Sequence, residues 1–454
     1  MNTPSKDSSG FSKLLDACIH CGFCLPACPT YRLTGSEAES PRGRIYLMRQ
    51  WQEARLSADD IQAPLDDCLG CLSCQTACPS GVQYDNLLMQ AREAMAPKTH
   101  HPFRRGVKRM ILRWILPNQT FLRWIRRGLR LTQWLKLDRW LLSQPWIETV
   151  SSQLHHQGAP HVAQWLKLAP VLSPKQSWLS RPLTEGSLFE PPEGIVPNGQ
   201  TVALFLGCVM NAMFSGIHEA TVHVLLAQGF RVAIPAGQTC CGALAYHAGE
   251  TDIARPLAEK NIAAFLQPPP QTSRHTLLDA SLLDTSYDWI VLNSAGCGAA
   301  LKSLPHWLKT PEAQSLSDRV IDVMALLAKS PLAPMRPQRA AQTVTYHAAC
   351  HLHHAQGVQS EPLSILNQVP NLTLVPLKDA ALCCGSAGVY NLEHPDLANG
   401  MLAEKIHHVL ATKADGVVSG NPGCLLQLQM GLRQAASAMT ACHPIEILAD
   451  AYSS

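Results

Sequence analysis

The chain has 454 residues, 46% of them hydrophobic and 16% charged, which is typical of a compact globular protein and excludes a disordered one. At about 150 residues per domain, this length predicts two or three domains. The formal net charge of +3 at pH 7 is too small to indicate a nucleic-acid partner.

The seventeen cysteines raise the alternative of a secreted disulfide scaffold, but the N-terminus argues against it. The stretch MNTPSKDSSGFSKLLDA has neither the apolar core nor the small-residue cleavage site of a signal peptide. No run reaches about 18 uninterrupted apolar residues, so no membrane-spanning helix is predicted. In the reducing cytosol, clustered thiols are more often metal ligands or catalytic groups. We therefore expect a cytoplasmic chain with reduced cysteines.

Two copies of one cysteine pattern, C-x2-C-x2-C-x3-C-P, occur in CIHCGFCLPACPT and CLGCLSCQTACPS. Tetrahedral zinc usually takes C-x2-C pairs from two separated places, so three cysteines at successive spacing suit zinc poorly. The same run binds the irons of bacterial two-cluster ferredoxins, in which the fourth cysteine ligates the other cluster. Carried over to matching positions, one [4Fe–4S] cluster is expected on Cys18, Cys21, Cys24 and Cys78, and the second on Cys68, Cys71, Cys74 and Cys28.

Residues 1–100 are expected to form an α-helical ferredoxin domain with two clusters. Between the cysteine runs, PRGRIYLMRQWQEARL opens with Pro41 and carries apolar residues at helical spacing, namely Ile45, Leu47, Met48 and Trp51. After Cys78, DNLLMQAREAMA has a helical pattern too. The helical insertion between the runs resembles the ferredoxin modules of respiratory dehydrogenase subunits.

Residues 101–200 predict a basic helical arm followed by a linker. Arginines alternate with Trp114, Trp124, Trp134, Trp140 and Trp146, and Asp138 is the only acid among them. The arm could cover a partner or the chain's own domains, lie on a membrane surface, or bind nucleic acid, although no known nucleic-acid module surrounds it. The stretch LSPKQSWLSRPLTEGSLFEPPEGIVPNG contains Pro, Ser and Gly and is predicted to be the linker.

Residues 201–335 and 336–454 predict two copies of one α/β unit. TVALFLGC ends at Cys208 and TVTYHAAC ends at Cys350, and each copy continues with a helix, a second strand, a CCG triplet and a third strand before a last cysteine. Strands that alternate with helices indicate parallel βαβ units, in which sites form at the carboxyl ends of the strands. The expected fold class is therefore α plus α/β: a helical two-cluster ferredoxin domain followed by a duplicated α/β cysteine-rich domain.

Each copy offers four cysteines: Cys208, Cys240, Cys241 and Cys297 in the first, and Cys350, Cys383, Cys384 and Cys424 in the second. The arrangement resembles the cysteine-rich CCG domain, whose pattern ends in C-x2-C, but Ser294 and Asn421 stand at the first cysteine of that pair. In heterodisulfide-reductase-like relatives such domains hold zinc or an unusual iron–sulfur cluster, and the cluster needs all five cysteines. Two interpretations stay open here. The cysteines could hold an additional cluster or zinc, or they could be buried thiols at an interface.

Five histidines lie near these cysteines in the sequence: His247, His347, His351, His353 and His354. A histidine there could complete a metal site or carry protons, because its ordinary pKa lies near neutrality. The other interpretation is a hydrogen-bonded structural residue, and the sequence favours the structural one.

The chain shows no dinucleotide fingerprint, P-loop or nucleophile motif, so a flavin is expected in another subunit. CIHCGFCLPACPTYRLTGSEAESPRGRIYLM, CLGCLSCQTACPSGVQYDNLL, NSAGCGAALK and LCCGSAGVYNLEHPDLA together resemble the iron–sulfur subunit of glycolate oxidase, also called glycolate dehydrogenase. The resemblance runs from about residue 11 to the C-terminus and is weakest across residues 101–200.

The resemblance implies two FAD-binding partner subunits, which together with this chain oxidise glycolate to glyoxylate. Electrons would pass from the flavin through the two clusters to a membrane quinone or another acceptor. The isolated chain would not oxidise glycolate itself, and it would be cytoplasmic and peripherally associated with the inner membrane. No nucleic-acid partner is expected.

Other functions fit the same residues. The chain could serve a dehydrogenase for D-lactate, another 2-hydroxy acid or glycerol 3-phosphate. It could also be an enzyme that reduces a disulfide at the CCG cysteines, as heterodisulfide reductases do, although Ser294 and Asn421 count against this. A redox sensor is the least expected function because no DNA-binding module is found.

Overall fold

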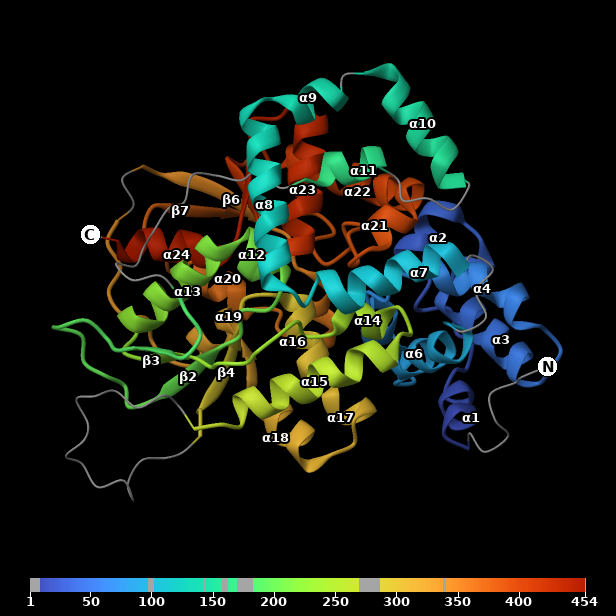
Figure 1. Ribbon diagram of the computed structural model, residues 1–454, viewed down its shortest axis with the longest axis horizontal. Helices are drawn as coiled ribbons and strands as arrows, with labels where there is room; N and C mark the ends of the chain where they lie inside the picture. Colours follow the sequence, from blue (N-terminus) through green and yellow to red (C-terminus); the bar gives the residue numbers. More distant parts are fainter. Residues whose placement is uncertain are drawn as a thin grey trace.

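The computed structural model describes residues 9–96, 102–142, 144–156, 162–169, 183–268, 286–337 and 340–453. Figure 1 shows the N-terminal helices at one end, two strand-containing units at the other, and an arm of helices that lies across them. The predicted fold class, α plus α/β, is confirmed. Within the described residues, no helix is both long enough and apolar enough to cross a membrane.

Short helices build the N-terminal part: α1 (Ser9–Asp16), α2 (Pro29–Thr34), the 3₁₀ turn η1 (Glu37–Glu39), α3 (Pro41–Gln52), α4 (Ala58–Asp66), α5 (Ser73–Thr76) and α6 (Tyr84–Met95). α3 begins at Pro41, as predicted, because Ser40 Oγ accepts a hydrogen bond from the Gly43 amide at 3.0 Å and caps the helix. Position 43 requires glycine, since a Cβ atom there would lie 1.9 Å from the Glu37 carbonyl oxygen. This close approach sets where the rest of α3 lies.

The described part of the basic segment is a series of helices. Its elements are α7 (Pro102–Met110), the π-helical turn η3 (Ile111–Ile115), α8 (Gln119–Trp134), α9 (Leu137–Leu142), α10 (Pro145–His156) and α11 (Val162–Leu168). In Figure 1, α8 stands beside the first strand-containing unit, while α9 and α10 lie at the edge of the molecule. Residues 172–182 of the predicted linker lie outside the described residues.

The first repeat, residues 201–335, is built on a sheet with the strand order β1-β3-β2-β4-β5. The strands are β1 (Ser187–Phe189), β2 (Thr201–Leu204), β3 (Arg231–Ile234), β4 (Trp289–Leu292) and β5 (Val320–Asp322). The last four pair in parallel, whereas β1 pairs antiparallel with β3 and places Ser187 opposite Ile234. Part of the stretch predicted to be linker is therefore an edge strand of this sheet.

Helices cover both faces of the first sheet, which explains why its parallel strands are buried except at Arg231 and Trp289, the half-buried first residues of β3 and β4. The helices are α12 (Val209–Met213), α13 (Ser215–Ala227), α14 (Ala243–His247), α15 (Thr251–Phe265), α16 (Ala295–Lys302), α17 (Leu304–Trp307), α18 (Pro311–Arg319) and α19 (Val323–Leu327).

The second repeat, residues 336–454, has a parallel sheet in the order β7-β6-β8-β9. Its elements are β6 (Gln342–Tyr346), the π-helical turn η5 (His351–Ala355), α20 (Glu361–Leu366), β7 (Leu372–Val375), α21 (Tyr390–Glu393), α22 (Pro395–Ala411), β8 (Gly416–Val418), α23 (Pro422–Gln434), β9 (Thr440–Cys442) and α24 (Pro444–Tyr452). This order repeats β3-β2-β4-β5 of the first sheet strand for strand. The predicted duplication is thus visible in the topology.

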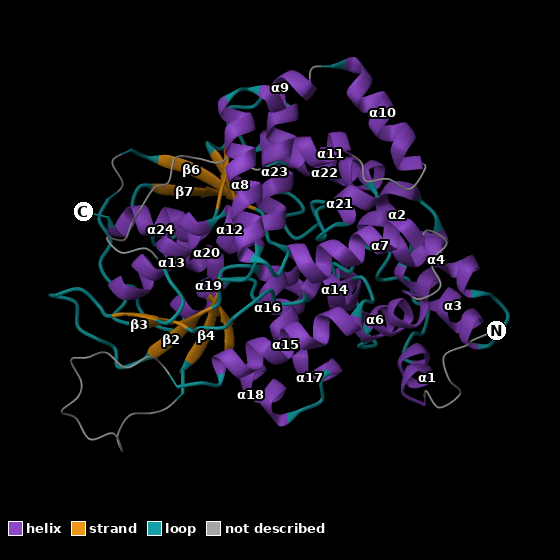
Figure 2. Ribbon diagram, viewed as in Figure 1, coloured by secondary structure: helices purple, strands orange, loops and turns teal. Residues whose placement is uncertain are grey.

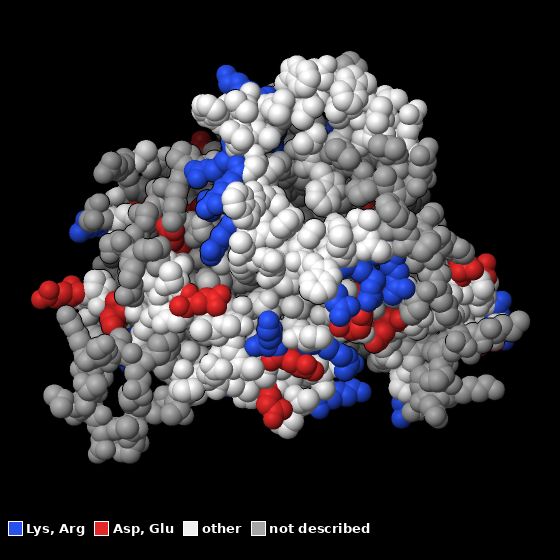
Figure 3. Space-filling view, in the orientation of Figure 1, with Lys and Arg blue, Asp and Glu red and all other residues white. Residues whose placement is uncertain are grey.

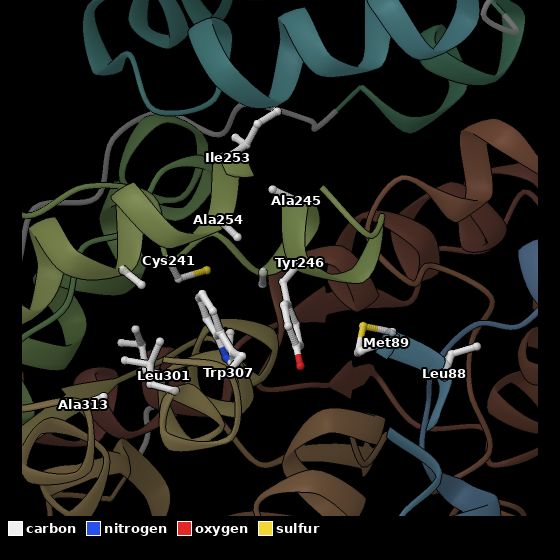
Figure 4. Packing of buried hydrophobic residues seen from close by; sticks show 14 of the residues in the cluster. Leu88, Met89, Cys241, Ala245, Tyr246, Ile253, Ala254, Leu301, Trp307 and Ala313 are labelled. Carbon is white, nitrogen blue, oxygen red and sulfur yellow. The ribbon is translucent and has the colours of Figure 1, made fainter. Parts of the chain in front are cut away.

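Buried apolar residues join the three parts of the molecule. Figure 2 shows helices between the two groups of strands, and there α13 of the first repeat contacts α24 of the second. Within the first repeat, Tyr246 of α14 stacks on Trp307 of α17 with ring centroids 4.8 Å apart. Leu88 and Met89 of α6 belong to the same buried cluster, as Figure 4 shows. The ferredoxin part is therefore packed directly against the first repeat.

Candidate functional site

Four buried cysteines form what we call the inner group: Cys28, Cys68, Cys71 and Cys74. Cys28 is the N-cap residue of α2, Cys68 and Cys71 lie on the loop that leads into α5, and Cys74 lies in α5 itself. In this loop Gly70 and Leu72 both have a φ of 63°, which folds the chain back on itself. Burial raises the pKa of Cys74 well above its ordinary value, and the neighbouring thiols of Cys71, Cys68 and Cys28 add to the effect. Cys28 of the first run thus lies among the cysteines of the second.

A buried arginine of α3 lies against the inner group. Arg44 is only 1% exposed, and its Nη1 donates to Thr30 Oγ1 at 3.0 Å and to Cys28 Sγ at 3.9 Å. Its Nη2 reaches the Glu39 carboxylate at 2.5 Å, and its Nε donates to the Pro64 carbonyl oxygen at 2.6 Å. The guanidinium is therefore fixed beside a cysteine sulfur by neutral and charged acceptors on all sides.

The remaining cysteines of the two runs form the outer group: Cys18, Cys21, Cys24 and Cys78. These four and Cys74 line a small hollow at the surface, together with Arg42 of α3. Cys21 is exposed and the other three are half-buried. The outer group therefore combines three cysteines of the first run with the last cysteine of the second, and it adjoins the inner group through Cys74.

Both groups offer a donor set that fits an iron–sulfur cluster. All seventeen cysteines are free thiols, and each group presents four sulfur atoms. The Gly70 amide donates to Cys68 Sγ at 3.5 Å, the kind of hydrogen bond that stabilises a thiolate ligand. Iron in clusters of this type is held by four cysteine thiolates. The residues present thus suit one cluster per group.

The first thiol set consists of Cys208, Cys240, Cys241 and Cys297 at the carboxyl ends of β2, β3 and β4. The thiols of Cys208 and Cys241 both hydrogen-bond to Cys240 and hold its pKa well below the ordinary value. The same contact with Cys240, together with burial, raises the pKa of Cys208. The cysteines that the sequence places at separate strand ends therefore meet in one place.

The second thiol set consists of Cys350, Cys383, Cys384 and Cys424 at the matching strand ends of the second repeat. His347 lies in this set: one ring nitrogen of His347 and the sulfur atoms of Cys384 and Cys424 all lie within 4.8 Å of one another. The ring is fully buried, and neither nitrogen has a hydrogen-bond partner of ordinary geometry. The second set thus has a histidine donor in addition to its four thiols.

The two positions that depart from the five-cysteine pattern lie where the repeats meet. Asn421 Nδ2 donates to Cys424 Sγ at 3.5 Å, while Asn421 Oδ1 accepts from the Gly296 amide at 3.2 Å. The Ala295 amide donates to the Gly420 carbonyl oxygen at 3.1 Å. Asn421 therefore helps to join the repeats, and neither Ser294 nor Asn421 supplies a fifth sulfur.

One cavity of about 410 Å³ connects the two thiol sets. It is lined by cysteines of both sets, by Cys68 of the inner group and by the cations Arg92, Arg105 and Lys108. The inner group also borders the second set, because Cys71, Cys350 and Cys383 belong to one buried cluster. Each cysteine group thus borders the next, from the outer group at the surface to the two thiol sets at the cavity.

The histidines near the cysteines divide into three cases. His347 lies among possible ligand sulfurs, whereas His247 and His351 face each other in the cavity with ring centroids 5.2 Å apart. His354 Nδ1 lies 3.0 Å from Thr76 Oγ1, and His353 packs edge-on against it, so these two have structural contacts. The structural interpretation that the sequence favours fits His353 and His354 better than it fits His347.

Sequence reasoning missed Arg44 and the cations of the cavity. Arg44 lies inside the PRGRIYLM segment, where the helical pattern was used only for its apolar residues. A charged residue at a helical position between Gly43 and Ile45, on the buried face, is the signal that could have marked it.

Comparison with known proteins agrees with this geometry. A 4Fe-4S dicluster domain family matches residues 14–82, and a cysteine-rich domain family (CCG) matches residues 202–302 and 344–429. The chain is 32% identical to the probable glycolate oxidase iron-sulfur subunit of Bacillus subtilis (strain 168), over 96% of this chain and 93% of the relative. It is 31% identical to the glycolate oxidase iron-sulfur subunit of Escherichia coli (strain K12), over 96% and 94%. Lactate utilization protein A of Geobacillus thermodenitrificans (strain NG80-2) is 28% identical over 54% of this chain and 98% of its own length.

Proposed function

The chain belongs to the family of glycolate oxidase iron–sulfur subunits, and on that premise we propose that it is the electron-transfer subunit of a flavin-dependent glycolate dehydrogenase. Two FAD-binding subunits would oxidise glycolate to glyoxylate, and this chain would carry the electrons to a membrane quinone or a similar acceptor. The chain would lie in the cytoplasm, at the inner face of the membrane, and would not oxidise glycolate alone.

The observation that carries the proposal is the crossed arrangement of the eight ferredoxin cysteines. The outer group, Cys18, Cys21, Cys24 and Cys78, would hold one [4Fe–4S] cluster, and the inner group, Cys28, Cys68, Cys71 and Cys74, would hold the second. When bound, each cluster takes up and releases one electron at a time, which links a two-electron flavin to an acceptor.

The chain's own residues give the two groups different tasks. The four cysteines of the inner group are buried and lie between the thiol sets and the outer group, so the inner group suits an internal position in the relay. Cys21 of the outer group is exposed, so this group suits exchange of electrons with a partner at the surface.

The two thiol sets support a second proposal, an additional metal centre. In the second set, His347 offers an unpartnered ring nitrogen beside two thiols, and four thiols are available in the first. Such donor sets suit zinc or a further cluster. Turnover of a disulfide at these cysteines is the competing function, and thiol–disulfide turnover by the isolated chain would distinguish it.

Substrate choice is the finer part of the proposal, because the cysteines do not encode it. Glycolate is preferred since the relatives that cover nearly the whole chain are glycolate oxidase subunits. D-lactate is the alternative, supported by a relative whose name refers to lactate utilization and which covers 54% of this chain.

The decisive experiment is anaerobic co-purification with the partner subunits, followed by assays with glycolate and D-lactate side by side. Iron and sulfide analysis should give about eight irons per chain if only the inner and outer groups are loaded. A clear excess that disappears in Cys241→Ser or Cys384→Ser variants would show metal in the thiol sets. A complex that reduces quinone at the normal rate without iron in this chain would contradict the relay.

A further inference from the structure

α8 of the arm carries its apolar residues on the side that faces away from the protein. Trp124, Leu131 and Leu135 are 62%, 56% and 57% exposed, and Phe121 and Ile125 on the same side are exposed too. Their spacing of three and four residues places them on one face of the helix. A surface helix normally turns such a face toward the core, so the outward apolar face indicates a medium other than water.

A row of arginines flanks this face. Arg123, Arg126, Arg127 and Arg130 recur at helical spacing and line a groove of about 290 Å³ between α8 and the first repeat. Asn211 and Ser215 line the other side of the groove, where Glu219 is the single carboxylate. Figure 3 shows basic side chains in a column along α8, with uncharged surface beside them.

The arginines of α8 differ from the cations of α7 in their partners. In α7, Arg105 pairs with Glu250 at 2.8 Å, Lys108 pairs with Glu393 at 3.0 Å, and Arg109 pairs with Asp252 at 2.5 Å. Within the described part of the chain the α8 arginines form no such ion pair. Arg127 lies over the Trp124 ring, 5.1 Å from its centroid, and Arg126 Nε is buried without a hydrogen-bond partner. The α7 cations therefore fix the arm to the protein, whereas the α8 cations form no ion pair with a carboxylate of the described residues and can bind an external anion.

The outward apolar surface continues beyond α8. Trp134 at the end of α8 is 78% exposed, and Trp140 of α9 and Trp146 of α10 are more than half exposed. Tryptophan prefers the boundary between lipid headgroups and acyl chains, where its ring is apolar and its N–H can reach water. Arginine beside it meets the phosphates of the same boundary.

We propose that α8 and α9 lie on an anionic phospholipid surface, with the arginine row at the lipid phosphates and the exposed tryptophans and aliphatic side chains at the acyl boundary. A lipid surface offers both partners at once: a layer of phosphates for the four guanidinium groups and an apolar layer for Trp124, Leu131 and Leu135. Nucleic acid offers phosphates but no medium for aliphatic side chains, and a protein partner would be seen in the experiment below.

The docking surface lies directly over the first thiol set. Leu122 of α8 packs with Cys208, Ala212 and Cys240, and Gln119 Nε2 donates to the Gly207 carbonyl oxygen at 2.7 Å. A membrane bound at α8 would therefore hold the end of the sulfur series close to the lipid. This inference deepens the proposed membrane acceptor and rests on that proposal only for the direction of electron flow.

The test is co-sedimentation of the full, anaerobically purified chain with vesicles. Vesicles of phosphatidylcholine with about one-third phosphatidylglycerol should bind the chain and shift its tryptophan fluorescence to the blue, and about 0.5 M salt should weaken the binding. The triple variant R123Q/R127Q/R130Q should lose at least about ten-fold in binding. Its charge-preserving counterpart R123K/R127K/R130K should keep it, which shows that the loss does not come from misfolding.

Two further variants separate the contributions. W124S/L131S should weaken binding and remove most of the fluorescence shift, because it removes the apolar contact and leaves the arginines. R255Q/K260Q/K309Q removes three exposed cations elsewhere and should bind vesicles normally. Unchanged binding of the arginine variant, or equal binding to pure phosphatidylcholine, would overturn the proposal. Complete release by inorganic phosphate would overturn it in favour of a soluble anion.

Failure of this proposal and failure of the relay give different results. A complex that transfers electrons to a soluble acceptor but ignores vesicles contradicts the docking surface alone. A chain that binds vesicles but accepts no electrons from a reduced flavin partner contradicts the relay alone. If the arginine variant binds vesicles normally but no longer assembles with the FAD subunits, α8 is a subunit interface and the lipid proposal is wrong.

Discussion

The inner and outer cysteine groups come from the same repeated motif but lie in different surroundings. Each takes three cysteines from one run and the last cysteine from the other. The outer group opens to solvent at Cys21, whereas all four cysteines of the inner group are buried. A motif of this kind determines which cysteines are the ligands, whereas the surrounding fold determines the solvent exposure of each site and the charges near it.

Two arginines of one helix make the difference concrete. Arg42 lies at the outer group and pairs at the surface with Glu37 at 2.6 Å, whereas Arg44 lies against the inner group and is buried. Charge and hydrogen bonds to sulfur are among the factors that set a cluster's reduction potential, and a cation favours the more negative, reduced state. The geometry therefore predicts that Arg44 raises the potential at the inner group more than Arg42 does at the outer one.

The largest expected effect is loss of a cluster. Cys21→Ser in the outer group and Cys71→Ser in the inner group should each lower the iron content from about eight to about four per chain. Both should stop reduction of the acceptor by glycolate in the complex, while the partner flavin can still be reduced.

The two variants should differ in stability, because only Cys71 is buried and its loss leaves an unfilled ligand site in the core. Thermal unfolding followed by circular dichroism measures this difference. Cys442→Ser is the matched control, since Cys442 lies in β9 outside both groups and both thiol sets and should leave iron and activity unchanged. Equal unfolding temperatures for Cys21→Ser and Cys71→Ser would contradict the claim that burial makes the inner group more important for stability than the outer group.

The second effect concerns Arg44. Arg44→Met leaves the half-buried Glu39 carboxylate without its partner, which should cost at most the about 3–5 kcal/mol of unfolding free energy lost when a fully buried ion pair is broken. The variant should also shift one of the two cluster potentials to a more negative value, measured by redox titration with electron paramagnetic resonance. Arg44→Lys keeps the charge and should recover part of that shift.

Arg42→Gln is the control for Arg44, because it removes a neighbouring cation that is paired at the surface. It should change unfolding far less and leave the inner potential in place. If Arg44→Met leaves both potentials unchanged, the role of the guanidinium is structural only.

The third effect is steric. Gly43→Ala places a Cβ atom against the Glu37 carbonyl oxygen and should displace the start of α3, at a cost of about 1–3 kcal/mol. Since Arg44 is the next residue, the inner group should be affected more than the outer one. Gly106→Ala in α7 is the control because nothing lies within 4 Å of its added methyl group. If denaturant unfolding shows no difference between the two variants, the steric requirement for glycine at position 43 would be contradicted.

The elements that the sequence predicted are those whose signals are local. The helix from Pro41 and the strands before Cys208 and Cys350 were readable because each follows from spacing over a few residues. β1 was missed because three residues form a strand only when β3 lies beside them, and that pairing spans more than forty residues. Loop composition alone does not reveal it.

The same limit applies to the site. The spacing of the eight ferredoxin cysteines predicts both groups, because the repeated motif assigns three cysteines of one run and the last cysteine of the other run to each cluster. The cavity shared by both thiol sets depends on how two repeats and a third domain pack, and His347 gains its place only when β6 and α23 come together. A single histidine in a sequence does not show whether its ring will face sulfur or a hydroxyl group, as His354 does.

The smallest expected effect is a difference in rate. When the loaded chain is exposed to air and an iron chelator, iron should leave in two phases of about equal size, because each group holds half of the total. The outer group should lose its iron first, since Cys21 is exposed to oxidant while all four cysteines of the inner group are buried. Absorbance of the iron–chelator complex over time measures both phases. The Cys21→Ser variant should lack the fast phase and Cys71→Ser the slow one. A single phase, or a fast phase that survives Cys21→Ser, would show that burial does not distinguish the groups.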